Sequence, residues 1–241
     1  MLKVGRMGCC GLACASMLGG WALAGCAAGG PGAELGIRPQ PFVVAAPEAK
    51  TLRVPQDERF SIVLSPSSRE PGPGGAADAR ADADAGGSAE VKADVQRGGK
   101  ASGTFQLGHA WKNDTDRQID VALATEYRYA FSVQAEQQPG ARDAGIDLSL
   151  KFYARDHLNR LVRSVDLVQH TTEQGDAARQ SQESFRVTLP LPPGATIYVY
   201  LAGHVTIDTA RSGRSASGEL RVSDVRLEAA LSPAPAVGSS P

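Results

Sequence analysis

The chain has 241 residues, with 25 basic and 26 acidic side chains, and its formal net charge is −1. This balance excludes a strong nucleic-acid binder, because such proteins need a basic surface that displaces counterions from phosphates. Aromatic residues make up only 5% of the chain, so any aromatic binding site must be built from few side chains.

The first residues have the pattern of a secretory signal. A positive start with Lys3 and Arg6 precedes an uncharged, largely apolar stretch that ends in small residues. Within it, Leu23-Ala24-Gly25-Cys26 resembles the lipobox of bacterial lipoproteins, which implies cleavage before Cys26 and acyl chains on that residue. Two or three chains make a lasting anchor, since each buried methylene contributes roughly 0.8 kcal/mol. We therefore expect a signal peptide over residues 1–25 and a lipid anchor at Cys26.

Two other interpretations of this segment stay open. Ala22-Leu23-Ala24 is also an A-x-A site, so ordinary cleavage would release a soluble protein with a free Cys26. The uncharged stretch is also long enough to remain as a membrane-spanning helix, although its five glycines weaken helix formation. Ala27 stands where an Asp commonly retains Gram-negative lipoproteins in the inner membrane. The resemblance therefore implies the outer membrane, with the protein facing the periplasm.

The cysteines fit a lipid-anchored protein. Three of the four, Cys9, Cys10 and Cys14, would leave with the signal, and the fourth would be acylated. No disulfide is then available, although an exported protein could form one. Stability must come from a hydrophobic core, and no cysteine-based metal site is available to the mature protein. Without the two basic residues of the signal, 23 basic and 26 acidic side chains remain, a net charge of −3.

Composition divides the rest of the chain into flexible and folded parts. Residues 26–40 are rich in Ala, Gly and Pro and predict a flexible tether, and residues 41–65 contain short strand-like pieces that we expect to join the folded unit. Residues 66–101 lack large apolar side chains and predict a disordered, low-complexity insertion, because little buried surface offsets the ordering entropy. Residues 232–241 predict a disordered tail. The folded domain is expected over residues 102–231.

This domain shows the two-residue period of β-strands. In its longest run, residues 119–133, the odd positions are apolar with only Thr125 breaking the series. A period of two over this length indicates a strand and not a helix. Shorter alternating stretches follow at nearly regular spacing, at residues 146–152, 161–168, 184–189, 197–205 and 220–227. Without periodic helices between them, they predict an all-β, antiparallel sandwich.

Three motifs resemble jelly-roll carbohydrate-binding modules, which have the galactose-binding-like fold. Residues 127–133 (YRYAFSV) look like an early strand of that family, residues 191–197 (LPPGATI) like its turn into a central strand, and residues 220–227 (LRVSDVRL) like its closing strand. In the last motif the alternation slips between Val222 and Val225, which predicts a β-bulge. The resemblance implies a jelly-roll-like sandwich, while a fold does not by itself determine function.

A glycan-binding sandwich needs exposed aromatic rings, because sugars stack on them through their apolar C–H faces. Tyr198 and Tyr200 alternate with apolar residues and so share the opposite face of their strand. Tyr153 is similarly out of phase with Phe152, and Trp111 lies near a turn. These three tyrosines and Trp111 are the ligand-binding candidates. In the competing interpretation the tyrosines are ordinary strand residues, since Tyr favours strands.

The sequence gives weaker signals for metal binding and for catalysis. Asn113-Asp114-Thr115-Asp116 offers oxygen ligands suited to calcium, but it lacks the spacing of a calcium loop, so we interpret it as a turn. The histidines are scattered, and no nucleophile elbow or phosphate loop occurs. We expect no metal, no cofactor and no enzymatic activity. The expected function is binding of an envelope glycan or a partner protein, with a structural role in an envelope complex as the alternative and a hydrolase as the least supported class.

Overall fold

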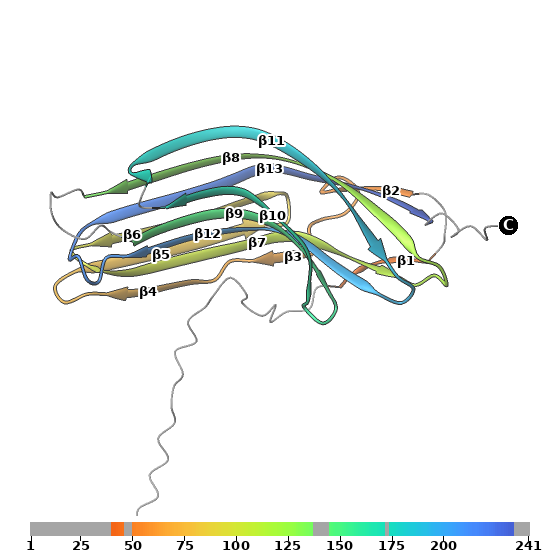
Figure 1. Cartoon of the computed structure of the whole chain (residues 1–241), viewed down its shortest axis with the longest axis horizontal. Coiled ribbons are helices and arrows are strands. Elements are labelled where there is room, and N and C mark those ends of the chain that lie inside the picture. The colour runs from red at the N-terminus through yellow and green to blue at the C-terminus, as the bar shows by residue number, and fades with distance from the viewer. Residues whose placement is uncertain (1–39, 46–49, 137–144, 172–173, 234–241) are drawn as a thin grey trace, which may run out of the picture. The chain divides into compact units, whose positions relative to one another are not determined.

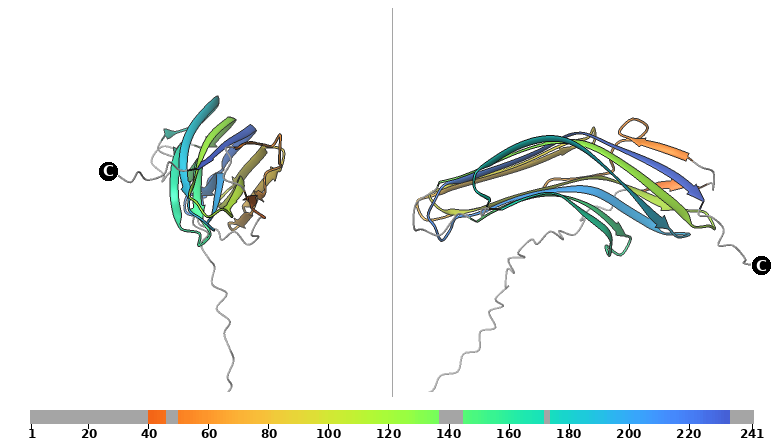
Figure 2. Two further views of the ribbon diagram at one scale, coloured as in Figure 1. Left: turned by 90° about the vertical axis from the view of Figure 1, so that its right-hand side faces the viewer. Right: turned by 45° about the horizontal axis from the view of Figure 1, so that its top comes forward.

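The computed structural model describes residues 40–45, 50–136, 145–171 and 174–233, which belong to one compact unit, Pro39–Pro241. The described residues form thirteen β-strands arranged in two sheets that pack face to face (Figures 1 and 2). Within these ranges no helix has the length and apolar character needed to cross a membrane.

The two sheets contain all of these strands. Sheet A has the order β1-β7-β12-β9-β10, with β3 and β4 also paired to β7. Its strands are β1 (Phe42–Val44), β3 (Ile62–Leu64), β4 (Ser67–Pro71), β7 (Gly99–Asn113), β9 (Gly145–Asp156), β10 (Leu161–Thr171) and β12 (Thr196–Asp208). Sheet B has the order β11-β8-β13-β6-β5, with β2 also paired to β13. Its strands are β2 (Lys50–Val54), β5 (Ala76–Asp84), β6 (Ser88–Gln96), β8 (Ile119–Ala135), β11 (Ala177–Leu191) and β13 (Ala216–Pro233).

The connections give the sandwich a jelly-roll-like topology. From β7 to β13 the chain changes sheet at every connection except the β9–β10 hairpin. Strand β12 returns between β7 and β9, and β13 returns between β8 and β6. Apart from the short parallel pairing of β1 with β7, the pairings of the described strands are antiparallel. The predicted all-β, jelly-roll-like sandwich is confirmed.

The hydrophobic core lies between the inner faces of the two sheets. In β8 the odd positions from Ile119 to Val133 are buried, including Thr125, while the even positions are not. Burying a large apolar side chain contributes roughly 1.5–3 kcal/mol, so the two-residue period fixes which face of β8 points inward. The shorter predicted stretches correspond to β9, β10, β11, β12 and β13, and in β10 the buried positions begin only at Val168.

The prediction of disorder over residues 66–101 is wrong. This segment forms β4, β5 and β6 and begins β7. Strand β6 alternates as strictly as β8, but its inward residues, from Ala89 to Val95, are Ala and Val. Small side chains fit because the sheets approach closely here: a methyl group at Gly103 of β7 would overlap Val91 of β6. The prediction failed because it relied on the small number of large apolar residues in this segment and ignored the two-residue period of its small apolar residues.

The other predicted segments differ in how far the structure describes them. Residues 41–65 join both sheets through β1, β2 and β3. The predicted signal peptide lies outside the described residues, as does the predicted tether except for Gln40. Of the predicted tail, Ser232 and Pro233 end β13, and the remainder lies outside the described residues.

Strand β13 contains the predicted bulge. Its register with β8 shifts between Ser223 and Arg226, and Asp224 has a positive φ of 52°. The N–H of Val225 donates to the carbonyl oxygen of Gly87 at 3.1 Å. On the edge of β13 that faces away from β8, the residues before the bulge pair with β6 and the residues after it pair with β2. The bulge thus lies where one strand exchanges neighbours.

Two glycines of the β7–β12 pair lie directly opposite aromatic residues. Gly203 faces Phe105 on the inner side of sheet A, and Gly108 faces Tyr200 on the outer side. A Cβ at Gly203 would overlap the Phe105 ring, and one at Gly108 would come within 2.5 Å of the Tyr200 Cβ. An aromatic neighbour compensates for the weak packing of a strand glycine. Gly108 therefore leaves the space in which Tyr200 lies.

A buried histidine lies beside Trp111 on the inner side of β7. His109 is 2% exposed, and its ring centroid is 5.0 Å from that of Trp111. Burial lowers the pKa of His109 to about 4, against the opposing effect of a backbone hydrogen bond at Arg59. The side chain is therefore neutral at neutral pH, although Glu58 Oε2 lies 3.4 Å from its Nε2.

This shift makes stability depend on pH in a defined direction. Between pH 6.5 and about 4 the unfolded chain binds a proton at His109 and the folded protein does not, so the free energy of unfolding falls as the pH falls. The full contribution of this pKa shift to the free energy of unfolding is about 3 kcal/mol, at 1.36 kcal/mol per pKa unit. Denaturant unfolding measures the free energy of unfolding at about pH 7.5 and at about pH 4.5. Between these two pH values, His109→Gln should lose roughly 2 kcal/mol less of this free energy than the wild type. The exposed His157→Gln is the control, and equal losses in His109→Gln and wild type would contradict the expectation.

Candidate functional site

Three of the four candidate residues lie together on the outer face of sheet A. Tyr198 and Tyr200 occupy the outward positions of β12, and Tyr200 is in register with Tyr153 of β9. The Tyr153 and Tyr200 ring centroids are 5.5 Å apart, with an interplanar angle of 33°. Tyr200 is only 5% exposed, whereas Tyr153 and Tyr198 are partly exposed. The predicted sharing of one face is confirmed, and Tyr153 and Tyr198 are the rings that a ligand could reach.

Arg155 of β9 links the tyrosines. Its Nε donates to the hydroxyl oxygen of Tyr200 at 2.9 Å, and its Nη1 donates to the carbonyl oxygen of Asn159 at 2.9 Å. The guanidinium carbon lies 5.4 Å from the Tyr153 ring centroid, and Arg155 is in register with Tyr198. These contacts hold the planar guanidinium in one orientation, with Tyr153 and Tyr198 as its neighbours.

Tyr200 acts as a neutral hydrogen-bonding group. Burial raises its pKa, and the positive charge of Arg155 opposes that rise without cancelling it. The phenol therefore keeps its proton at neutral pH. Because its oxygen accepts the bond from Arg155, the hydroxyl hydrogen is free to be donated to another acceptor.

The next row across the outer face is polar. Ala202 of β12 is in register with Gln106 of β7 on one side and with Lys151 of β9 on the other. Lys151 Nζ lies 2.9 Å from Asp166 Oδ1, and this hydrogen bond raises the pKa of Lys151. Gln106 is 7% exposed, and its Oε1 is buried without a hydrogen-bond partner among the described residues. An unpaired buried acceptor is costly, so Gln106 marks a place where a ligand donor or a water would be stabilising.

A neutral histidine network completes this face. His204 contacts the hydroxyls of Thr104 through Nδ1 at 2.8 Å and of Thr206 through Nε2 at 2.6 Å. Burial lowers its pKa, although the charge of Asp147 acts in the opposite direction. Both ring nitrogens are thus engaged with hydroxyls. In the part of the chain that the structure describes, no group of three or more His, Cys, Asp or Glu could hold a metal ion.

The placement of Trp111 contradicts its prediction as a ligand-binding residue. Trp111 is 0% exposed and belongs to the hydrophobic core. The prediction relied on its nearness to a turn, but β7 continues to Asn113, so Trp111 lies within the strand. Its odd position then directs the ring inward, together with Phe105 and Leu107.

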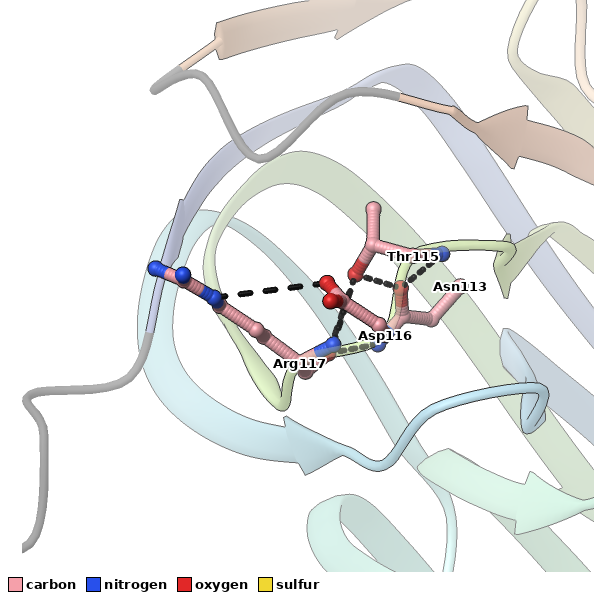
Figure 3. A network of polar contacts seen from close by, with 4 residues as sticks. All are labelled: Asn113, Thr115, Asp116 and Arg117. Carbon is pink, nitrogen blue, oxygen red and sulfur yellow. Dashed lines mark hydrogen bonds and ion pairs between the residues drawn. The ribbon is translucent and has the colours of Figure 1, made fainter.

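The predicted turn after β7 is confirmed (Figure 3). Asn113 Oδ1 accepts the backbone N–H of Thr115 at 3.0 Å, and Asn113 Nδ2 donates to the carbonyl oxygens of Arg117 and Leu191 at 2.7 and 2.9 Å. Asp114 Oδ1 lies 2.6 Å from Lys112 Nζ. The side-chain amide of Asn113 therefore builds the loop that leads from sheet A to sheet B.

A second group of aromatic residues lies inside the sandwich. Tyr127 and Tyr129 donate to the carboxylate of Glu183 at 3.3 and 3.1 Å. Burial, together with Glu183, raises the pKa of both phenols. The two tyrosines are at most 2% exposed, so their rings belong to the core and offer no stacking surface.

A pocket of about 540 Å³ lies at the far end of sheet B from the β9–β10 turn. Two of its carboxylates bind backbone groups: Asp176 accepts the N–H of Ala135 at 2.9 Å, and Glu136 accepts that of Ser215 at 3.2 Å. These contacts hold neighbouring strand ends together. The outer face of sheet A therefore remains the better candidate site.

No protein-family model matches the chain, and no match was found among the curated proteins. Among solved structures, the chain is similar to a family 11 carbohydrate-binding module from Clostridium thermocellum in complex with a β-1,3-1,4-mixed-linked tetrasaccharide, with 10% identity and a TM-score of 0.21, over 73% of this chain and 94% of that one. A xylan-binding CBM22 domain from Paenibacillus barcinonensis shows 12% identity and a TM-score of 0.19, over 73% and 98%.

Larger proteins also show a likeness. An arabinose-bound α-L-arabinofuranosidase has 11% identity and a TM-score of 0.21, over 68% of this chain, and this chain spans 23% of its length. A structure of infectious bursal disease virus has 12% identity and a TM-score of 0.25, over 80% of this chain and 42% of that one. TM-scores of this size carry no argument about ligand or activity. The sandwich assignment rests on the chain's own sheet topology.

Proposed function

We propose that the protein is a lipoprotein of the outer membrane, anchored through Cys26 and facing the periplasm, whose sandwich binds an envelope glycan on the outer face of sheet A. One observation carries the glycan part of this proposal. Tyr153 and Tyr198 are partly exposed next to Arg155, one on the same strand and one in register with it, and Arg155 is itself held by Tyr200. An aromatic ring beside a fixed hydrogen-bond donor is the combination that orients a sugar.

The charges of this face suggest which glycans it would accept. Lys151 is paired with Asp166, whereas the recorded partners of Arg155 are a neutral phenol and a backbone carbonyl. The positive charge of Arg155 is thus available to a ligand, so glycans that carry carboxylates, as peptidoglycan does on its peptide stems, are favoured over neutral ones.

The test is co-sedimentation of the purified protein with peptidoglycan sacculi. Tyr153→Ala should weaken binding about tenfold or more, equivalent to about 1.4 kcal/mol, because it removes the exposed stacking ring. Tyr153→Phe keeps the ring and should bind like the wild type. Trp111→Phe, a change inside the core, controls for effects on the fold alone. Wild-type binding by Tyr153→Ala would exclude Tyr153 as the stacking ring, and wild-type binding by Tyr153→Ala/Tyr198→Ala would exclude this face as the glycan site.

A further inference from the structure

The large apolar side chains that are exposed among the described residues gather at one end of the sandwich. They are Val43 (46% exposed), Leu158 (60%), Leu161 (54%) and Val162 (45%). Three of them belong to the β9–β10 hairpin, and Val43 lies in β1. Pairing connects these elements: Phe42 is in register with Trp111, Trp111 with Ile197, and Ile197 with Asp156, where the hairpin turn begins.

The hairpin turn is ordered by its own contacts. Asp156 Oδ1 accepts the N–H groups of Leu158 and Arg160 at 2.8 and 2.9 Å, and its Oδ2 accepts the Nε of Arg160 at 2.6 Å. Asn159 adopts the left-handed conformation, with φ of 62°. Leu158 and Leu161 are thus held in solvent by a defined turn, which bends away from the sandwich in Figures 1 and 2.

The hairpin that carries three of these apolar side chains has a net positive charge. Residues 155–163 contain three arginines and one acidic residue, Asp156. Asp156 pairs with Arg160, and the contacts recorded for Arg155 are to Tyr200, Tyr153 and Asn159. The hairpin thus combines exposed leucines with a net positive charge, and Arg163 follows Leu161 by two residues. This composition suits the interface of an anionic bilayer.

The proposed anchor would hold this end near the membrane. The described unit begins at Gln40, two residues before Phe42, and therefore at the same end as the hairpin. Cys26 lies fourteen residues before Gln40, a length of chain that spans at most about 50 Å when extended and about 20 Å as a flexible coil. Phe42 and Asp156 lie three strand spacings apart, about 15 Å.

We propose that the tip of the β9–β10 hairpin rests on the bilayer to which Cys26 is anchored, with Leu158, Leu161 and Val162 in the interface and Arg163 at anionic headgroups. This inference rests on the lipid anchor proposed above and does not depend on glycan binding. It gives the sandwich a fixed orientation, with the hairpin end toward the membrane.

A fluorescent probe tests the contact. In the acylated protein the one remaining cysteine is blocked, so Leu161→Cys can be labelled uniquely with an environment-sensitive dye. In vesicles of phosphatidylethanolamine and phosphatidylglycerol we expect a blue shift and quenching by lipid-borne quenchers. The same label at Ala210→Cys, an exposed site in the β12–β13 turn at the opposite end, should stay in water. Arg163→Glu in the Leu161→Cys protein should reduce the blue shift.

The outcomes separate the proposals. If the protein floats with the vesicles and the label at position 161 remains in water, the hairpin contact is wrong and the anchor stands. A protein that does not float with vesicles contradicts both. A blue shift that occurs only when envelope protein is added would show that the hairpin contacts a protein and not lipid, and would overturn the inference.

Discussion

Replacing Cys26 with Ser is expected to abolish acyl labelling and to release the protein from the membrane fraction. The acyl chains are the main membrane attachment in the proposed function, and each buried methylene contributes roughly 0.8 kcal/mol. Without them the hairpin tip alone would bind weakly and would be removed by high salt, which screens its arginines. Metabolic labelling with an alkyne fatty acid, followed by fractionation, measures both effects.

Cys14→Ser is the matched control. It removes a cysteine from the predicted signal and should leave both labelling and fractionation unchanged. If the Cys26→Ser protein stayed in salt-washed membranes, an uncleaved helix would be the better interpretation. A wild-type protein that is soluble and has a free thiol would instead indicate cleavage at Ala22-Leu23-Ala24.

Gly203→Ala is expected to lower the free energy of unfolding by about 3 kcal/mol, at the upper end of the usual effect of overpacking. The added methyl would overlap the ring of Phe105, which is 0% exposed and belongs to a close-packed core. Chemical denaturation measures the loss. Gly145→Ala, at the start of β9, is the milder comparison: its new Cβ would lie 3.3 Å from the carbonyl oxygen of Asp208, a tight contact but not an overlap, so its loss should be smaller.

The double variant Gly203→Ala/Phe105→Ala tests the cause. Phe105→Ala alone should lower stability by about 3–5 kcal/mol through the cavity that it leaves. Because the methyl at position 203 then has room, the double variant should be no less stable than Phe105→Ala. Simple addition of the two single effects would show that the overlap with Phe105 is not what destabilises Gly203→Ala.

The sequence predicts strands well where the inward residues are large. The run in β8 alternates between large apolar and polar residues, and it fixes both the strand and its inner face. Strand β5 alternates as regularly, but its inward residues are alanines. Each buried alanine contributes little free energy, so the composition of the segment does not predict a strand. Alanine fits at these positions because the sheets approach closely at Gly103 and Val91. This close approach exists only in the assembled sandwich and cannot be predicted from the segment alone.

The candidate site could be predicted in part. The phase of Tyr153, Tyr198 and Tyr200 along their strands correctly assigns them to an outer face. Their proximity depends on the register between β9 and β12, which tertiary packing decides. Arg155 was missed, although it is in phase with Tyr153, two residues earlier, and the same reasoning could have found it. The burial of Gln106 has no signal in the sequence, because it results from neighbours on other strands.

The covered edge of β7 has a consequence for neighbouring molecules. Strands β1, β3 and β4 occupy this edge in succession, so its backbone groups are not open to another chain. At the outer edge of sheet B, β5 instead presents the charged residues Asp78, Arg80, Asp82 and Asp84. Open edges are templates for intermolecular pairing. Copies held on one bilayer by the proposed anchor would meet often in two dimensions, and at these two places they would find little open backbone with which to pair. The remaining edges include β10 of sheet A and β11 of sheet B.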